Sequence, residues 1–306
     1  MPSRKPLKKS KEPKLHKLAD KLTEIIIYFM VIFSPWAFGT TEPWSIWTMN
    51  ITAYALGMLL MTKWSIRFAT NYNQKPKLKI NELSSKQNLL RLIQKNCTIF
   101  LAGSMFLLLA YILISAINAR ASFNFDTNEY TYFDGVNKNL PHSYNAGGTW
   151  FLFWQYLGLF ILYWSTRDWF AGAKSSISLN PRLKRLLILF CFNGGALALE
   201  CILQRIYFGE HNGKLLFLIE PGINSQNIAQ FGPFAYRSNA ASYLSLIWPL
   251  GLGLFIQLGS ENLDYGKRRI GNGPELLLIP CTILAASGPI ISSARGGALV
   301  MIGLLI

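Results

Sequence analysis

The chain has 306 residues, of which 51% are hydrophobic and only 15% are charged, and its formal net charge is +15. Soluble domains carry roughly 25% charged residues, so this composition argues against a soluble globular protein. A nucleic-acid-binding protein gathers its basic residues on one compact face. Here the basic residues lie between long apolar runs, which excludes a nucleic-acid partner and indicates a membrane protein that contacts anionic lipid.

The chain begins with a basic segment, residues 1–21, that carries eight Lys and Arg residues. We expect it to be a cytoplasmic tail. The apolar run that follows has no small-residue cleavage site after Phe38. We therefore interpret this run as an uncleaved anchor rather than a signal peptide. Residues 22–306 are expected to form one transmembrane domain.

Seven apolar stretches approach the length of roughly 20 residues that a helix needs to cross a bilayer. They cover residues 22–39, 46–61, 98–117, 149–165, 186–207, 240–258 and 275–291. An eighth begins near Gly296, and the residues from there to Ile306 would span only about 16 Å. Half a helix leaves backbone groups unpaired in lipid, so we expect the native protein to continue. The predicted fold is an all-α, polytopic transmembrane bundle.

Basic residues are distributed unequally between the two sides of this bundle. Segments 1–21, 62–97, 166–185 and 259–273 together carry 24 Lys and Arg residues, and the alternate side carries six. The positive-inside rule therefore places the N-terminus in the cytoplasm. We expect the basic cytoplasmic segments to be solvated, lipid-facing loops without a chemical role. The outer surface would consist of segments 40–45, 118–148, 208–239 and 292–295.

Two of the few outer cations, Arg237 and Arg295, each precede a predicted helix. A helix N-terminus offers free N–H groups and a positive dipole end, both of which favour an anion. The guanidinium group adds a planar pair of donors that fits phosphate oxygens. Together the two arginines predict a phosphate or pyrophosphate clamp, with the glycines after Arg295 allowing close backbone approach. The alternative is that each arginine only reaches lipid headgroups.

Glu200 is a further candidate substrate-binding residue. It lies about 10 Å inside the outer end of its predicted span, and an ionisable group at such a depth indicates function. It could pair with Arg205, Arg237 or Arg295, or it could be a structural or protonated acid. No cluster has metal-ligand spacing, so we predict no metal or cofactor, and we assign no catalytic role to His142 or His211. Glycine pairs at 147–148 and 194–195 are expected to allow close helix packing.

Two short motifs in the last third of the chain carry a resemblance to a known family. Residues 231–239 read Phe-Gly-Pro-Phe-Ala-Tyr-Arg-Ser-Asn and are followed by Trp-Pro-Leu at 248–250. Residues 292–297 read Ser-Ser-Ala-Arg-Gly-Gly, one helix later. In both motifs and their order the chain resembles the O-antigen ligase/polymerase superfamily. The resemblance covers about residues 186–306, and the first 185 residues match only in their pattern of spans.

This resemblance implies an all-helical inner-membrane enzyme with about a dozen spans. Such an enzyme transfers a glycan from an undecaprenyl-pyrophosphate carrier to a lipid or glycan acceptor on the periplasmic face, without a metal. Arg237 and Arg295 match the positions thought to hold the pyrophosphate, and Asn239 and Ser293 lie in the same motifs and join them as expected substrate-binding residues. The family's presumed general base is a histidine on a later outer loop. The catalytic residue therefore stays unassigned, and these 306 residues are expected to be inactive alone.

Several functional alternatives remain open from the sequence. An O-antigen ligase and a polysaccharide polymerase differ in their acceptor, which the sequence does not identify. A glycolipid transporter or flippase would show helices broken near the midplane and inverted repeats. Pro249, Pro280 and Pro289 can kink spans, but no repeat is visible. A non-catalytic membrane scaffold would not need arginines at two outer helix starts.

Overall fold

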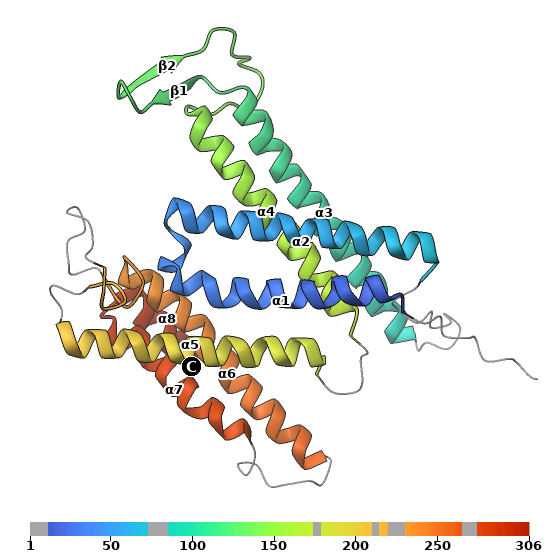
Figure 1. Cartoon of the computed structure of the whole chain (residues 1–306), viewed down its shortest axis with the longest axis vertical. Helices are drawn as coiled ribbons and strands as arrows, with labels where there is room; N and C mark the ends of the chain where they lie inside the picture. Colours follow the sequence, from blue (N-terminus) through green and yellow to red (C-terminus); the bar gives the residue numbers. More distant parts are fainter. Residues whose placement is uncertain are drawn as a thin grey trace, which may run out of the picture. The chain divides into compact units, whose positions relative to one another are not determined.

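The computed structural model describes residues 12–72, 85–173, 179–209, 214–219, 230–264 and 274–305. In these ranges the chain is mostly helical, which agrees with the all-α prediction apart from one small β-hairpin (Figure 1). The elements in chain order are α1 (Lys14–Trp36), η1 (Phe38–Thr40), α2 (Pro43–Thr70), α3 (Ser85–Ile117), β1 (Ala121–Asn124), β2 (Glu129–Tyr132), α4 (Ala146–Ala171), α5 (Pro181–Phe208), α6 (Arg237–Asp264), η3 (Pro274–Leu277), α7 (Leu278–Ile291) and α8 (Arg295–Leu305).

Among the described residues, three helices are long and apolar enough to cross a membrane. They are Asn96–Ile117 within α3, Pro181–Phe208, which is α5, and Arg237–Ser260 within α6. These three coincide with predicted spans, and the chain therefore has the character of a membrane protein. The other predicted stretches also fall largely on helices, but seven spans stay a prediction. The first stretch ends early, because α1 stops at Trp36 and the turn around Gly39 has a positive φ of 63°.

The helix ends follow ordinary capping chemistry most clearly in α5. Asn180 accepts a hydrogen bond from the backbone N–H of Arg182 and precedes Pro181, which suits the first helical position. At the other end Gly209 has a φ of 71°, and its N–H donates to the carbonyl oxygen of Arg205. Glycine adopts this backbone conformation without strain, so both ends of α5 are encoded locally.

By packing, the chain forms two compact units. The first contains the described residues of 1–23 and 50–171, and the second those of 24–49 and 172–306. The division into a cytoplasmic tail, 1–21, and a transmembrane domain, 22–306, stays a prediction. Residues 14–21 of the predicted tail already belong to helix α1.

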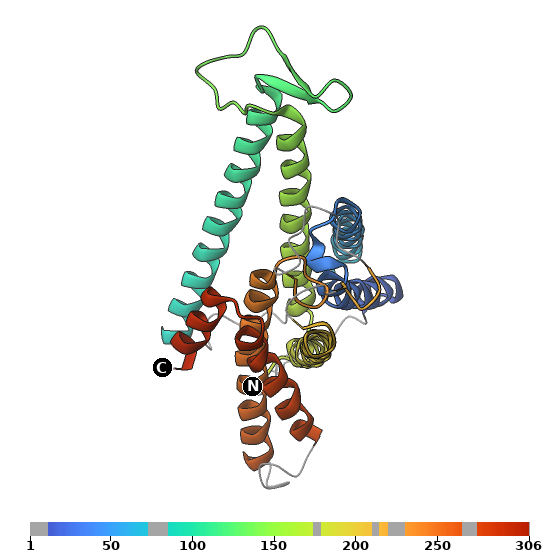
Figure 2. The same cartoon turned by 90° about the vertical axis from the view of Figure 1, so that its left-hand side faces the viewer.

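In the first unit, α3 and α4 lie side by side, and the β-hairpin joins their ends (Figure 2). The hairpin pairs Phe123 with Tyr130 in antiparallel register, within a segment predicted as a polar loop. Asn118, just past α3, stabilises the connection, because its side chain donates to the carbonyl oxygens of Asn137 and Pro141. The predicted outer segment 118–148 is therefore an ordered cap on two helices.

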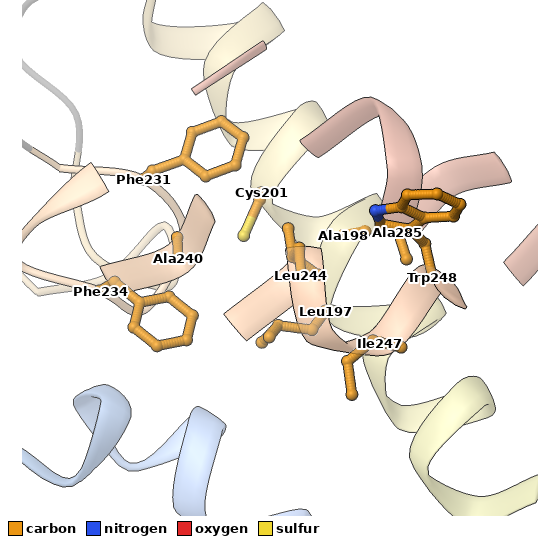
Figure 3. Packing of buried hydrophobic residues seen from close by; sticks show 10 residues of the cluster. All are labelled: Leu197, Ala198, Cys201, Phe231, Phe234, Ala240, Leu244, Ile247, Trp248 and Ala285. Atoms are coloured by element: carbon orange, nitrogen blue, oxygen red, sulfur yellow. The ribbon is translucent and has the colours of Figure 1, made fainter. Parts of the chain in front are cut away.

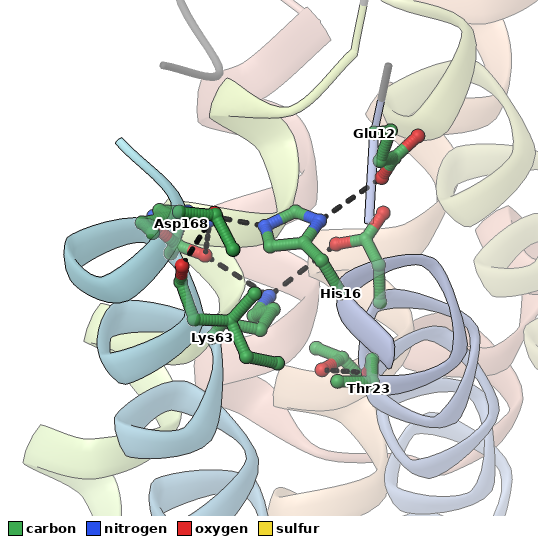
Figure 4. Close-up of polar contacts among 10 residues, drawn as sticks. Glu12, His16, Thr23, Lys63 and Asp168 are labelled. Carbon is green, nitrogen blue, oxygen red and sulfur yellow. Dashed lines mark hydrogen bonds and ion pairs between the residues drawn. The ribbon is translucent and has the colours of Figure 1, made fainter. Parts of the chain in front are cut away.

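The first unit also contains a buried network of charges, drawn in Figure 4. Lys63 is fully buried, and its Nζ lies 3.3 Å from Oδ1 of Asp20 and 2.9 Å from Oδ2 of Asp168. Arg67 donates to both oxygens of Asp168 at 2.6 and 2.9 Å. The expectation that these cytoplasmic cations belong to solvated loops is wrong for Lys63 and Arg67, because α2 continues to Thr70 and carries both residues against acids of α1 and α4.

His16 extends the network toward the start of α1. Nε of Arg67 donates to Nε2 of His16 at 3.1 Å, and Nδ1 of His16 lies 2.9 Å from Oε1 of Glu12. Because a guanidinium N–H can only donate, Nε2 accepts and the ring proton sits on Nδ1, where it is donated to Glu12. The fully buried histidine is thus held in one tautomer by its two neighbours.

The second unit packs α7 against α5 and α6 around a core of buried residues (Figure 3). Close approach depends on glycine. A methyl group on Gly194 would lie 2.6 Å from Cγ2 of Ile247, and one on Gly195 would lie 2.7 Å from Cβ of Cys281. These contacts confirm the packing predicted for the pair 194–195. For the pair 147–148 the prediction is wrong within the described part of the chain, where only the side chain of Asn145 lies within 4 Å of added methyl groups.

Candidate functional site

The first arginine of the predicted clamp is placed by a tight turn. Phe231 and Phe234 exchange backbone hydrogen bonds of 3.1 and 3.2 Å, and Gly232 between them has a φ of 60°. Both phenylalanines are buried in the core near Cys201 of α5 (Figure 3). This anchoring fixes the point at which α6 begins, and Arg237 is the first residue of that helix.

The second arginine, Arg295, is the first residue of α8. The turn before it is closed by Ser292, which is fully buried, donates through Oγ to the carbonyl oxygen of Pro289 and accepts from the N–H of Ala294. Farther into α8, a methyl group on Gly297 would lie 2.6 Å from Cβ of Ala241 in α6. The start of α8 therefore rests directly on the start of α6, so that two helix N-termini lie together.

One cavity of about 950 Å³ opens where these two helices begin. Arg237, Ser238, Ser242 and Ser245 line it from α6, and Ser293 and Arg295 line it from the turn and start of α8. Tyr236, Leu246, Ala294, Gly296, Gly297 and Val300 complete the lining. The two arginines and Ser293, which the sequence placed in separate motifs, thus share one cavity.

The cavity has the electrostatic character of an anion site. The side chains of Arg237 and Arg295 form no hydrogen bond or ion pair with any described residue, and no acidic residue is among those that line the cavity. The positive ends of two helix dipoles add to the two guanidinium charges. Four cationic elements without a counter-charge make the cavity attractive to an anion from outside the protein.

Two predicted substrate-binding residues do not line the cavity. Asn239 is exposed on the first turn of α6, and its N–H donates to the carbonyl oxygen of Tyr236 at 3.0 Å. Glu200 lies in α5 beneath the turn before α6, where a methyl group on Gly232 would lie 2.7 Å from its Oε2. Neither carboxylate oxygen of Glu200 accepts a hydrogen bond from a described residue. The pairing with an arginine that the sequence suggested is therefore not made through such a bond.

Neither described histidine, His16 or His142, is among the residues that line the cavity. His142 is in the first unit and contacts the carbonyl oxygen of Leu140 at 3.3 Å. His211 lies outside the residues that the structure describes. Among the residues that it does describe, no group of three or more His, Cys, Asp or Glu side chains could hold a metal ion.

Sequence reasoning missed the serines of the cavity. Ser238, Ser242 and Ser245 follow one another at spacings of four and three residues, which places them on one face of a helix. In an otherwise apolar helix, a hydroxyl stripe that begins beside Arg237 is a readable signal. The individual serines were overlooked because serine is common in membrane helices and carries no charge.

The groups that line the cavity suit the binding of an anion. The lining contains no histidine, carboxylate or thiol, and its hydroxyls come from Tyr236 and the serines. The two arginines can hold and stabilise negative charge. Comparisons of the chain with protein-family models, with curated proteins and with solved structures found no match.

Proposed function

We propose that this chain is part of a metal-independent, O-antigen ligase-like glycosyltransferase of the bacterial inner membrane. It would transfer a glycan from an undecaprenyl-pyrophosphate carrier to a lipid or glycan acceptor on the periplasmic face. One observation carries the proposal: Arg237 and Arg295, from two different helix starts, line the same cavity and lack any described counter-charge. The pyrophosphate of the carrier is the anion that we assign to them.

The proposed chemistry needs such a site. An acceptor hydroxyl attacks the anomeric carbon, the bond from that carbon to the phosphate oxygen breaks, and the pyrophosphate leaves with additional negative charge. Donors placed where charge develops stabilise the transition state, often by several kcal/mol. Arginine suits the task because it remains charged and binds phosphate oxygens with two parallel hydrogen bonds. The base that takes the acceptor's proton would be the histidine that the family resemblance implies on a later outer loop.

The membrane arrangement is part of the same proposal. Seven spans and an eighth that begins near Gly296 would place the N-terminus in the cytoplasm and both arginines at the outer boundary. Ser293 would contact the phosphate directly. Asn239, exposed on the first turn of α6, would contact the part of the substrate outside the cavity, and Glu200 would act through the turn at Gly232 that it touches.

A polysaccharide polymerase of the same superfamily is the nearest alternative, because it needs the same pyrophosphate site and differs only in acceptor. A glycolipid transporter or flippase is a more distant one. The described helices α6 and α7 continue through Pro249 and Pro289, whereas a transporter would be supported by helices broken near the midplane. Accumulation of unpolymerised carrier-linked units in a deletion strain would favour the polymerase, and accumulation of finished, unattached glycan would favour the ligase.

The proposal is tested by replacing the arginines in the native gene and following the surface polysaccharide. Arg237→Ala and Arg295→Ala should each lower attachment or polymerisation by about 10-fold or more, since a hydrogen bond to a charged group contributes about 1.5–3 kcal/mol. Arg120→Ala is the matched control, because Arg120 is an exposed, predicted outer arginine outside the cavity. Unchanged polysaccharide at normal protein levels in both cavity variants would overturn the assignment.

A further inference from the structure

Ser245 is a buried hydroxyl-bearing residue at the wall of the cavity. Its side chain is only 3% exposed, it lines the cavity, and its Oγ forms no hydrogen bond with a described residue. Some helical hydroxyls are satisfied locally, since Thr23 donates to the carbonyl oxygen of Ala19 and Thr282 donates to that of Leu278. Ser115 and Ser165 of the first unit, like Ser245, form no hydrogen bond with a described residue, but neither lines the cavity. A buried hydroxyl without a partner costs free energy. Its presence at the wall of a cationic cavity indicates that the partner comes from outside the protein.

The serine stripe gives this hydroxyl a position along the cavity. Ser238, Ser242 and Ser245 share one face of α6 and extend about 10 Å along the helix axis at 1.5 Å per residue. Arg237 stands at the outer end of the stripe. The lining also includes two apolar side chains, Leu246, which follows Ser245 on α6, and Val300 on α8. The cavity therefore combines arginines at two helix starts, a row of hydroxyls along α6 and apolar side chains.

This combination of charged, hydroxyl and apolar groups fits an amphipathic anion better than a free one. An anionic headgroup suits the arginines, and an isoprenoid chain suits Leu246 and Val300. Ser245 lies at the junction, where the phosphate that carries the isoprenoid chain would be. A hydroxyl there can donate to an unesterified oxygen of that phosphate without adding another charge to the site.

We infer that Ser245 binds the lipid-side phosphate of an isoprenoid diphosphate, while Arg237 and Arg295 hold the phosphate farther out. The inference rests on the proposed function and adds a specificity determinant to it. A monophosphate has only one phosphate, and the two arginines attract it to the outer position. Ser245 therefore distinguishes an isoprenoid diphosphate from the corresponding monophosphate, which is the form of the carrier after its terminal phosphate is removed.

The experiment uses the 306-residue chain purified in detergent, with farnesyl diphosphate and farnesyl monophosphate as probes. Dissociation constants are measured for wild type, Ser245→Ala, Arg237→Ala and Arg295→Ala, together with the thermal midpoint of each protein without ligand. Ser165→Ala is the matched control. Ser165 is 1% exposed and its Oγ also forms no hydrogen bond with a described residue, but it lies in α4 of the first unit and does not line the cavity.

We expect Ser245→Ala to weaken diphosphate binding about 10-fold, the loss typical of one hydrogen bond to a charged group. Monophosphate binding should change less than about twofold. The thermal midpoint of the empty protein should stay the same or rise, because the variant removes an unsatisfied hydroxyl. Ser165→Ala should share the effect on the midpoint and leave both dissociation constants unchanged.

The possible failures separate the two proposals. If the arginine variants lose diphosphate binding and Ser245→Ala does not, the role of Ser245 is wrong and the proposed function stands. Equal weakening of both probes by Ser245→Ala would also overturn its role in specificity. If wild type binds neither probe, or the arginine variants bind as wild type does, both proposals are wrong.

Discussion

Two regions of the chain hold basic side chains in opposite ways. In the first unit, Lys63 and Arg67 are paired with Asp20 and Asp168, and Lys63 is completely buried. In the second unit, Arg237 and Arg295 line a cavity without a described counter-charge. A buried cation with acids on either side is part of the architecture, because its removal leaves buried acids unpaired. A cation without a counter-charge at a cavity wall is available to a ligand. The partners of a basic residue therefore say more about its role than its position in a loop or a helix.

The largest loss of stability should follow from a substitution in the buried charge network of the first unit. Replacing Lys63 with methionine keeps the length of the side chain but leaves Asp20 and part of Asp168 without a partner at a buried position. Breaking a buried pair in this way typically costs about 3–5 kcal/mol. We expect the free energy of unfolding in detergent to fall by that order, measured by denaturant titration followed by circular dichroism.

The double variant Lys63→Met with Asp20→Leu provides the control. The double variant removes Lys63 together with Asp20, and Asp168 keeps Arg67 as its partner. It should therefore recover a large part of the stability. If Lys63→Met alone unfolds as wild type does, the buried network is not structural, and the contrast with the cavity fails.

The difference between the two regions shows what could be predicted from the sequence. Arg237 and Arg295 could be predicted to lie at helix starts because a helix start is a local feature of the sequence, and each is the first residue of a helix. Their place on the outer side stays a prediction. The pairing of Lys63 was missed because Asp20 lies 43 residues away and a count of loop charges treats every lysine alike. The predicted second span also ended at residue 61, whereas α2 continues to Thr70 and carries Lys63 inward.

A similar limit applies to packing. Apolar runs were sufficient to locate the helices, and the pair 194–195 was correctly expected to lie in a close contact. The contact of Gly297 with Ala241, which brings the two arginine-bearing helix starts together, depends on the path of the intervening helix α7. No local pattern encodes that path. The hairpin between α3 and α4 was also missed, because its strands have only four residues each.

The pH dependence of stability tests whether the charge of Asp168 stabilises the buried network of the first unit. Asp168 follows the predicted span 149–165 and so lies outside it. Burial alone would raise the pKa of its carboxyl, but hydrogen bonds from Arg67 and the charge of Lys63 hold that pKa below its usual value. An acid whose pKa is lower in the folded state stabilises the fold above its unfolded pKa of about 3.9 and loses this contribution as pH falls through the folded pKa.

Asp168→Asn should therefore be less stable than wild type at about pH 7, and the gap should narrow below about pH 4. Thermal midpoints of both proteins across this range measure the gap. We expect the effect to be smaller than that of Lys63→Met, because Lys63 retains Asp20 as a partner. A gap that does not change with pH would show that the charge of Asp168 is not what stabilises the network.

A smaller effect should follow from moving the two arginines apart. A methyl group on Gly297 would lie 2.6 Å from Cβ of Ala241, so Gly297→Ala forces α8 away from α6. Overpacking of this kind costs about 1–3 kcal/mol, and it should also weaken binding of farnesyl diphosphate. Gly303→Ala lies on the same helix, and no atom of a described residue lies within 4 Å of the added methyl group. This variant should gain about 0.5–1 kcal/mol from helix propensity and bind normally. Equal behaviour of the two variants would mean that the contact does not set the cavity.

The smallest change in stability is expected on replacing a cavity arginine, and whether stability rises or falls shows if that arginine is structural. A positive side chain at a helix N-terminus opposes the helix dipole, and here a second arginine lies at the same cavity. Without ligand, Arg295→Ala should change stability by no more than about 0.5 kcal/mol, with a slight increase at low ionic strength. Because salt screens exposed charges, that increase should disappear as the salt concentration rises toward about 1 M. A loss of more than about 1 kcal/mol would instead make Arg295 a structural residue like Lys63. If Arg295 serves to bind an anion, Arg295→Ala should slightly raise the stability of the protein without ligand and weaken the binding of farnesyl diphosphate.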